Sequence, residues 1–194
     1  RLADKLADEK HQQILAKATG TIIDQVEAMQ QIVADFSQIA KPLETRRQNL
    51  QLNPLLRQIA ELYREQHLTL DLHDPLGDIS ADPVHLRQIL INLMKNAIEA
   101  TQNQDAPQIR WHTSQHNGQI TLDIEDNGPG FADLNKDPFE PYVTNKPKGT
   151  GLGLAIVKKI VHEHDGTISA GHSRDLGGAK ITITLPLTTT STTP

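Results

Sequence analysis

Two asparagines lie four residues apart in the segment PVHLRQILINLMKNAIEA, whose apolar periodicity predicts a helix. At this spacing Asn92 and Asn96 share one side of the helix, at the border of its apolar arc. An amide at such a border is costly unless it is hydrogen-bonded, so the pair either bonds nearby backbone or faces a ligand. An amide oxygen is a hard, neutral ligand that suits Mg²⁺ when a triphosphate supplies the negative charge.

A carboxylate and two glycines follow the predicted strand QITLDIED, with Asp126, Gly128 and Gly130 spaced as D-x-G-x-G. Asp-Asn-Gly is also a common hairpin turn, and for this segment alone that interpretation stays open. An irregular loop follows, however, instead of an immediate return strand. A carboxylate at this point can accept a hydrogen bond from an adenine amine, while the glycines let the chain pass close to a ligand.

A glycine-rich turn leads directly into a helical pattern in KGTGLGLAIVKKIV, where Gly149, Gly151 and Gly153 alternate with other residues. Helix N-termini suit phosphate because they offer free N–H groups and the positive end of the helix dipole. The spacing matches neither the dinucleotide fingerprint G-x-G-x-x-G nor the P-loop G-x-x-x-x-G-K-[ST]. Its meaning therefore depends on the two segments that precede it.

Composition excludes several classes of function. The net charge of -5 argues against a nucleic-acid partner, and the absence of cysteine excludes disulfides, cysteine–zinc sites and thiol catalysis. No apolar run is long enough to span a bilayer, no signal peptide opens the chain, and Arg1 is not a natural start. We expect a cytoplasmic piece of a longer protein, attached to a membrane only through missing upstream segments.

The elements that must position these residues differ along the chain. The first forty residues carry one apolar stripe on a predicted long helix that ends at Pro42; the stripe consists of Ala18, Ile22, Val26, Met29, Val33, Phe36 and Ala40. This stripe needs another helix, either in its own domain or in a dimeric helical hairpin. Beyond residue 50 the pattern is mixed α and β. Asn53 and Asp82 are the predicted N-caps of two helices, with Pro54 and Pro83 at the first helical positions.

Taken together and in this order, the three segments resemble sensor histidine kinases, in the GHKL superfamily of ATP-binding domains shared with gyrase, Hsp90-type chaperones and mismatch-repair ATPases. NLMKNAIEA resembles the N box, DNGPG the G1 box, FEPY an F box and GTGLGL the G2 box. The resemblance covers about residues 50–187. The stretch FEPYVTNKPKGTGLGLAIVKKIV looks particularly like the nitrogen-regulation, NtrY-type kinases.

The resemblance implies a Bergerat-type fold, a two-layer α/β sandwich with a mixed, mostly antiparallel sheet and helices on one face, preceded by a long N-terminal helix. Residues 1–41 would be the C-terminal part of the dimerisation and phosphoacceptor hairpin, mainly its second helix. Residues 42–50 would be a linker and 51–187 the ATP-binding catalytic domain, with an ATP lid at 131–148. The polar tail, residues 188–194, is expected to be disordered.

The resemblance also implies ATP and Mg²⁺ as cofactors and assigns roles to residues. Asn96 would hold Mg²⁺, Asn92 would lie beside the phosphates, and Asp126 would bind the adenine amino group. Gly128 and Gly130 would let the backbone approach the base. The phosphates would be lined by Gly149, Thr150, Gly151, Leu152, Gly153 and Leu154.

Two further residues of the expected lid are candidates for contact with the nucleotide. Lys146 is a candidate phosphate contact, and so a catalytic candidate beside the two asparagines, although it could equally be a solvated loop charge. Tyr142 is a candidate nucleotide neighbour, although Tyr142 and Phe139 could instead plug the lid against the core.

The residue at position 92 discriminates within the superfamily, because hydrolysing relatives typically carry a glutamate there and asparagine cannot act as a general base. This favours transfer of the γ-phosphoryl group to a histidine on a dimeric helical hairpin, for relay to a response-regulator aspartate. None of the nine histidines fits the family's acceptor motif on the N-terminal helix. We therefore expect the acceptor upstream of Arg1, so that this chain cannot phosphorylate itself.

Two alternatives remain. The first is a serine kinase of the anti-sigma-factor type on the same fold, against which the N-terminal helix argues. The second is a degenerate, non-enzymatic module for nucleotide binding, dimerisation or partner docking, against which the intact glycine and asparagine boxes argue.

Overall fold

The computed structural model describes residues 11–12, 14–15, 17–23, 25–26, 29–30, 33, 44–133, 136–144 and 149–188. The chain divides into two compact units, Arg1–Lys41 and Pro42–Pro194. The described residues of the first unit are helical, as the apolar stripe predicts. Their large apolar side chains are exposed: Ile14, Leu15, Ile22, Ile23, Val26, Met29 and Val33. Phe36 and Ala40 lie outside the described residues.

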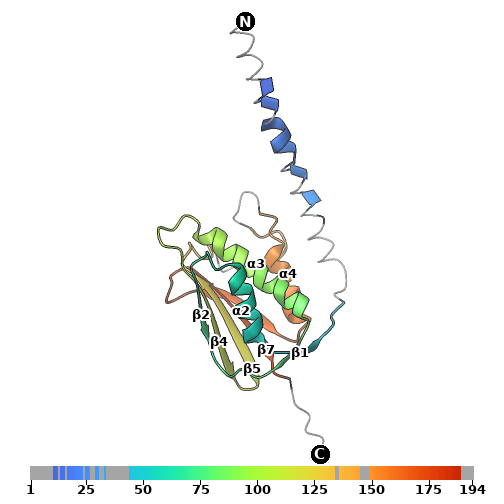
Figure 1. The fold of residues 1–194 in the computed structure, drawn as a ribbon, viewed down its shortest axis with the longest axis vertical. Helices are drawn as coiled ribbons and strands as arrows, with labels where there is room; N and C mark the ends of the chain where they lie inside the picture. Colours follow the sequence, from blue (N-terminus) through green and yellow to red (C-terminus); the bar gives the residue numbers. More distant parts are fainter. Residues whose placement is uncertain are drawn as a thin grey trace, which may run out of the picture. The chain divides into compact units, whose positions relative to one another are not determined.

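The second unit is built on a mixed five-stranded sheet with strand order β2-β4-β5-β7-β6 (Figure 1). β2 and β4 pair in parallel, and the other neighbours in this sheet are antiparallel. The turn between β4 and β5 contains Asn117 and Gly118 at positive φ, the conformation of a tight hairpin turn. The strands are β2 Leu68–Leu72, β4 Ile109–His116, β5 Gln119–Asp126, β6 Thr167–His172 and β7 Ala179–Pro186.

Three helices cover one face of this sheet: α2 (Leu52–Leu62), α3 (Pro83–Thr101) and α4 (Gly153–His162) (Figure 1). The core lies between the two layers, where sheet side chains such as Trp111 and Ile183 are buried with helix side chains such as Leu90. Alternate strand residues point to the opposite, polar face. The two-layer α/β sandwich is therefore confirmed. None of the described helices is both long and apolar enough to cross a bilayer.

The two proline-marked helix starts behave differently. Asp82 caps α3 as predicted, because its side chain accepts hydrogen bonds from the backbone N–H groups of Val84 (2.9 Å) and His85 (3.5 Å). The expectation that Asn53 caps α2 is wrong, since α2 begins at Leu52. The buried Asn53 side chain instead donates to the His73 carbonyl at 2.7 Å.

The chain enters the second unit at a point where the start of α3 and the end of α4 meet. The Arg46 N–H donates to Asp82 Oδ2 at 2.8 Å, and the Asp82 N–H donates to Nε2 of the buried His164 at 3.0 Å. Arg47 forms an ion pair with Asp165 at 2.5 Å. Residues 48–50, which we expected in the linker, form strand β1 (Gln48–Leu50) and pair with β3 (Ile79–Ala81).

Burial lowers the pKa of His164, although its Nδ1–H donates to the Ile160 carbonyl at 2.7 Å. Both ring nitrogens are therefore satisfied in the neutral form. Burial by itself would raise the pKa of Asp82, but the N–H donors of Arg46 and Val84 outweigh it and hold that pKa below its usual value.

Candidate nucleotide-binding site

The candidate adenine-binding carboxylate is held in one position by two backbone donors. Asp126 ends β5, its side chain is buried, and its Oδ1 accepts hydrogen bonds from Gly128 N–H (2.9 Å) and Ala179 N–H (3.2 Å). Gly178 passes so close that an added Cβ would lie 2.6 Å from this oxygen and 2.4 Å from the Asp126 carbonyl oxygen. The end of β5 and the start of β7 are therefore packed backbone against backbone.

The loop after Asp126 lies directly against the asparagine helix. A Cβ at Gly128 would lie 2.8 Å from the Ala100 carbonyl oxygen and 2.9 Å from its Cβ. On α3, Asn92, Asn96 and Ala100 follow one another at steps of four residues, so they form one row along the helix. The row of two half-buried amides therefore leads to the loop that holds Asp126. The structure thus brings together the N box and the G1 box.

The later part of the expected lid is bonded to the glycine turn that follows the lid. Tyr142 N–H donates to the Gly151 carbonyl at 3.0 Å, and a Cβ at Gly151, where φ is 66°, would lie 2.6 Å from the Tyr142 carbonyl carbon. The Tyr142 side chain is 64% exposed, so it does not plug the lid against the core. Of the expected lid, residues 134–135 and 145–148 lie outside the described residues, and Lys146 is among them.

The F-box segment is held by a buried ring and by an ion pair to α4. Phe139 is 5% exposed, so it plugs this segment against the core as the alternative interpretation has it. Asp137 accepts from Lys158 Nζ at 2.7 Å and from Phe139 N–H at 2.9 Å. The hydrogen bond with Lys158 lowers the pKa of Asp137 and raises that of Lys158.

The start of α4 is open to a ligand. The N-cap residue, Leu152, is buried and provides no side-chain capping bond, so the first N–H groups of the helix keep their donor capacity. A Cβ at Gly153 would meet nothing within 4 Å. A surface hollow of about 350 Å³ is bordered by Asp137, Phe139 and Lys158 beside the F box. Neither this hollow nor a second one of about 270 Å³ is lined by the three polar candidates Asn92, Asn96 and Asp126.

Residues that the sequence analysis missed also contribute to this site. Ala100, Gly178 and Ala179 touch the G1 box through backbone or Cβ atoms. The sequence carried a signal in the Gly-Gly pair that precedes the last strand, AKITITLPL, because a small-residue pair at a strand start permits close backbone approach.

The fold and the site are those of a two-layer α/β sandwich with a polar row on α3 facing the loop after β5, and a comparison with family models gives the family. Residues 81–189 match the model described as "Histidine kinase-, DNA gyrase B-, and HSP90-like ATPase". The chain therefore belongs to this family. The match begins at the end of β3 and spans every segment of the candidate site.

Known relatives place the chain near sensor histidine kinases. It is 33% identical to sensor histidine kinase ZraS of Escherichia coli O157:H7, over 96% of this chain and 40% of that protein. It is also 33% identical to nitrogen regulation protein NtrY of Azorhizobium caulinodans, over 89% of this chain and 24% of that protein. The crystal structure of full-length ShkA in complex with AMPPNP matches with a TM-score of 0.68 and 29% identity, over 81% of this chain and 35% of that one. The chain thus spans less than half the length of these relatives.

Proposed function

We propose that this chain binds ATP with Mg²⁺ and provides the catalytic domain that transfers the γ-phosphoryl group to a histidine of a dimeric helical hairpin. One observation carries the proposal: the row Asn92, Asn96 and Ala100 on α3 runs to Gly128, and so to the fixed carboxylate of Asp126. Groups suited to phosphate-bound metal and to adenine thereby lie along one line. The ShkA structure, which contains AMPPNP, supports a nucleotide in a domain of this fold.

The residues present fit a magnesium ion that is held mainly by the nucleotide. In the described part of the chain, no group of three His, Cys, Asp or Glu side chains could form a protein cage for a metal. Mg²⁺ keeps several waters and is commonly bound by one or two protein oxygens together with substrate phosphates, and the amide oxygen of Asn96 provides one such ligand. When bound, the ion neutralises charge on the phosphates.

The other residues would bind and orient the nucleotide. Asp126 would accept the adenine amine, Asn92 would lie beside the phosphates, and the N–H groups at the start of α4 would receive them, from Gly153 onward. An asparagine at position 92 cannot take a proton from water, so this site would favour transfer to a positioned acceptor over hydrolysis. Lys146 and Thr150 remain candidates for phosphate contact at the lid.

The partners follow from the family and from the first unit. We infer that two copies associate through the N-terminal helices, whose described apolar side chains, such as Ile22 and Val33, are exposed. The sensor histidine kinases among the relatives support a response-regulator receiver domain as the next phosphoryl acceptor.

Calorimetry with ATP in the presence and absence of Mg²⁺ tests the nucleotide site. The Asn96→Ala variant should lose most of the gain in affinity that Mg²⁺ provides, while Lys95→Ala, which removes an exposed neighbouring side chain on the same helix, should behave as the parent. Equal Mg²⁺-dependent binding by Asn96→Ala and the parent would refute the metal assignment.

Phosphoryl transfer is tested by mixing this chain and ATP with a longer relative of the chain that contains the hairpin and has a disabled nucleotide site. We expect acid-labile phosphate on the longer protein. Acid-stable phosphate would favour the serine-kinase alternative, and no phosphate on any acceptor would contradict transfer by this domain.

A further inference from the structure

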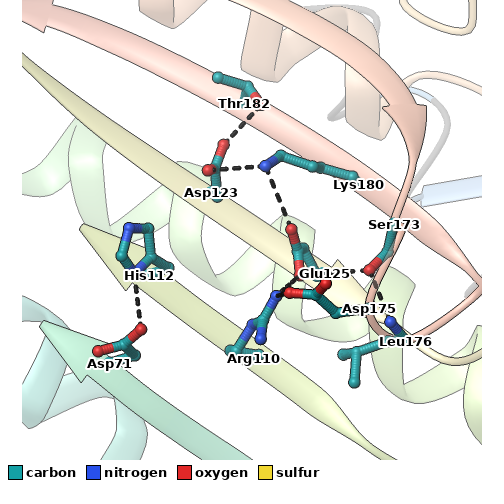
Figure 2. Close-up of polar contacts among 10 residues, drawn as sticks. All are labelled: Asp71, Arg110, His112, Asp123, Glu125, Ser173, Asp175, Leu176, Lys180 and Thr182. Atoms are coloured by element: carbon teal, nitrogen blue, oxygen red, sulfur yellow. Dashed lines mark hydrogen bonds and ion pairs between the residues drawn. The ribbon is translucent and has the colours of Figure 1, made fainter. Parts of the chain in front are cut away.

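The open face of the sheet carries two rows of paired polar side chains (Figure 2). Arg110, Glu125 and Lys180 lie directly opposite one another on β4, β5 and β7. A second row contains His112, Asp123 and Thr182, extended by Asp71 on β2. These side chains are on the face that the helices do not cover, because alternate residues of each strand are buried in the core.

Glu125 is the most buried member of the first row, with a side chain that is 6% exposed. Arg110 donates to it, Lys180 Nζ lies 3.2 Å from its Oε1, and the Ser173 hydroxyl donates to its Oε2 at 3.2 Å. A carboxylate at this depth needs such donors, and removing one partner of a buried ionic group is costly. Hydrogen bonds with Asp175 and then with Glu125 raise the pKa of Arg110, so the guanidinium keeps its charge.

This cluster holds the turn between β6 and β7, residues 173–178. The Ser173 hydroxyl, while donating to Glu125, accepts from Leu176 N–H at 3.0 Å, and Ser173 N–H donates to the Gly178 carbonyl at 2.9 Å. On the other side of the same turn, Asp175 pairs with Arg110 at 2.5 Å. The turn is therefore attached to β4 and β5 at two points (Figure 2).

The last residues of this turn reach the opposite face of the sheet. Gly178 packs against Asp126, and Ala179 N–H donates to Asp126 Oδ1. Glu125 and Asp126 are consecutive, so their side chains point to opposite faces of β5. Glu125, on the open face of the sheet, therefore holds the turn that leads into β7. The first residue of β7, Ala179, in turn donates to Asp126 on the helix-covered face.

We propose that Glu125, with Arg110 and Ser173, positions Asp126 for base recognition and so determines how strongly the site prefers adenine over a purine that lacks the 6-amino group. This inference rests on the proposed function. Glu125 acts through the turn and Ala179 and does not itself touch the nucleotide. When the cluster is broken, the Ala179 N–H shifts and the Asp126 carboxylate loses this backbone donor.

The test measures the affinities for ATP and for inosine triphosphate by calorimetry on the whole chain. Glu125→Gln should lower the ratio of these affinities by roughly tenfold, and Ser173→Ala by roughly threefold, because each weakens the link from the sheet to the turn. Asp71→Asn is the matched control, since it removes the same kind of charge from a polar pair with His112 (2.8 Å) on the same sheet face without touching the turn. Its ratio should equal that of the parent.

A purely structural role would lower the melting temperature without changing the ratio. The inference is overturned if the parent prefers ATP and both Ser173→Ala and Glu125→Gln keep that preference. If Glu125→Gln does not fold, Ser173→Ala decides. A parent that binds neither nucleotide would instead contradict the proposed function, and the inference with it.

Discussion

The two ends of the candidate site are built in different ways. At the adenine end, residues 126–128 and 178–179 meet backbone against backbone, so an added Cβ at Gly178 would lie 2.4 Å from the Asp126 carbonyl oxygen. At the lid base the described contacts include a hydrogen bond between Tyr142 and Gly151, a buried Phe139 ring and a partly exposed ion pair between Asp137 and Lys158. The proposed adenine end is thus held by close backbone packing, whereas the described contacts of the lid base are mainly those of side chains.

The largest effect is expected at the adenine end. Gly178→Ala places a methyl group where backbone atoms already lie, so Asp126 must move and affinity for every adenine nucleotide should fall by about 100-fold. Gly171→Ala on β6, where a Cβ would meet nothing within 4 Å, is the control. Calorimetry with ATP and AMP, together with thermal unfolding, checks the result. Full ATP affinity in Gly178→Ala would show that this close approach does not fix Asp126.

A change at the lid base should act on the phosphate end alone. Gly151→Ala strains a residue with φ of 66° and displaces Tyr142, so ATP affinity should fall by roughly tenfold while AMP affinity stays unchanged. The control is Gly118→Ala, which has the same kind of backbone strain (φ of 76°) in the β4–β5 turn. An equal loss for ATP and AMP would abolish the distinction between the two ends.

His164, just after the end of α4, lies in neither the adenine end nor the lid base, so changing it tests stability apart from nucleotide binding. Because burial keeps the pKa of His164 below 6.5, the unfolded chain takes up this proton first as pH falls. The neutral His164 side chain therefore contributes fully to the free energy of unfolding above about pH 6.5. This contribution is lost as the pH falls towards the lower pKa of His164 in the folded protein. Between pH 7.5 and 5.5 the parent should lose more unfolding free energy than His164→Gln does, because the folded protein takes up this proton less readily than the unfolded chain.

Urea unfolding across this pH range gives the measurement, and the exposed His162→Gln serves as the control. Parallel pH profiles for the parent and His164→Gln would contradict the assignment. The ratio of ATP to AMP affinity should not change in the His164 variant.

The smallest effect is expected from the ion pair at the lid base. Lys158→Met removes the partner of Asp137, and because both side chains are 30% or more exposed, the pair contributes less than about 1 kcal/mol. The affinity for ATP should fall roughly two- to threefold, and the affinity for AMP should change little. Calorimetry gives both values. Arg64→Met breaks an exposed pair with Glu61 at the C-terminal end of α2 and should change neither affinity. A loss above tenfold would mean that the lid base is as rigid as the adenine end.

Local sequence signals predicted the parts of this molecule that depend on local chemistry. Asp82 caps α3 because its own next two N–H groups are in reach, and the Asn-Gly turn closes a hairpin through its positive φ angles. Asn53 carries the same cap-and-proline signal and fails. Its side chain bonds to the His73 carbonyl and accepts from Thr113, partners that become close only when β2 pairs with β4.

The same distinction applies to the site. The spacing of Asn92, Asn96 and Asp126 identified the candidates, because a helix row and a strand end follow from short-range periodicity. Two features of the site could not be predicted: the hydrogen bond from Ala179, and the row of Arg110, Glu125 and Lys180. Both depend on the register between strands that are distant in the sequence. Lys146 lies outside the described residues, so its role as a phosphate contact remains a prediction.

The meeting point of Arg46, Asp82 and His164 has a mechanical consequence. The segment that enters the second unit is bonded to the first residue before α3 and, through Arg47, to the residues just after α4. The remaining length of these helices carries the asparagine row and the open N-terminus at Gly153. A displacement of the entering segment would therefore act on the start of α3 and the end of α4 together, and both helices lead from there to the candidate site.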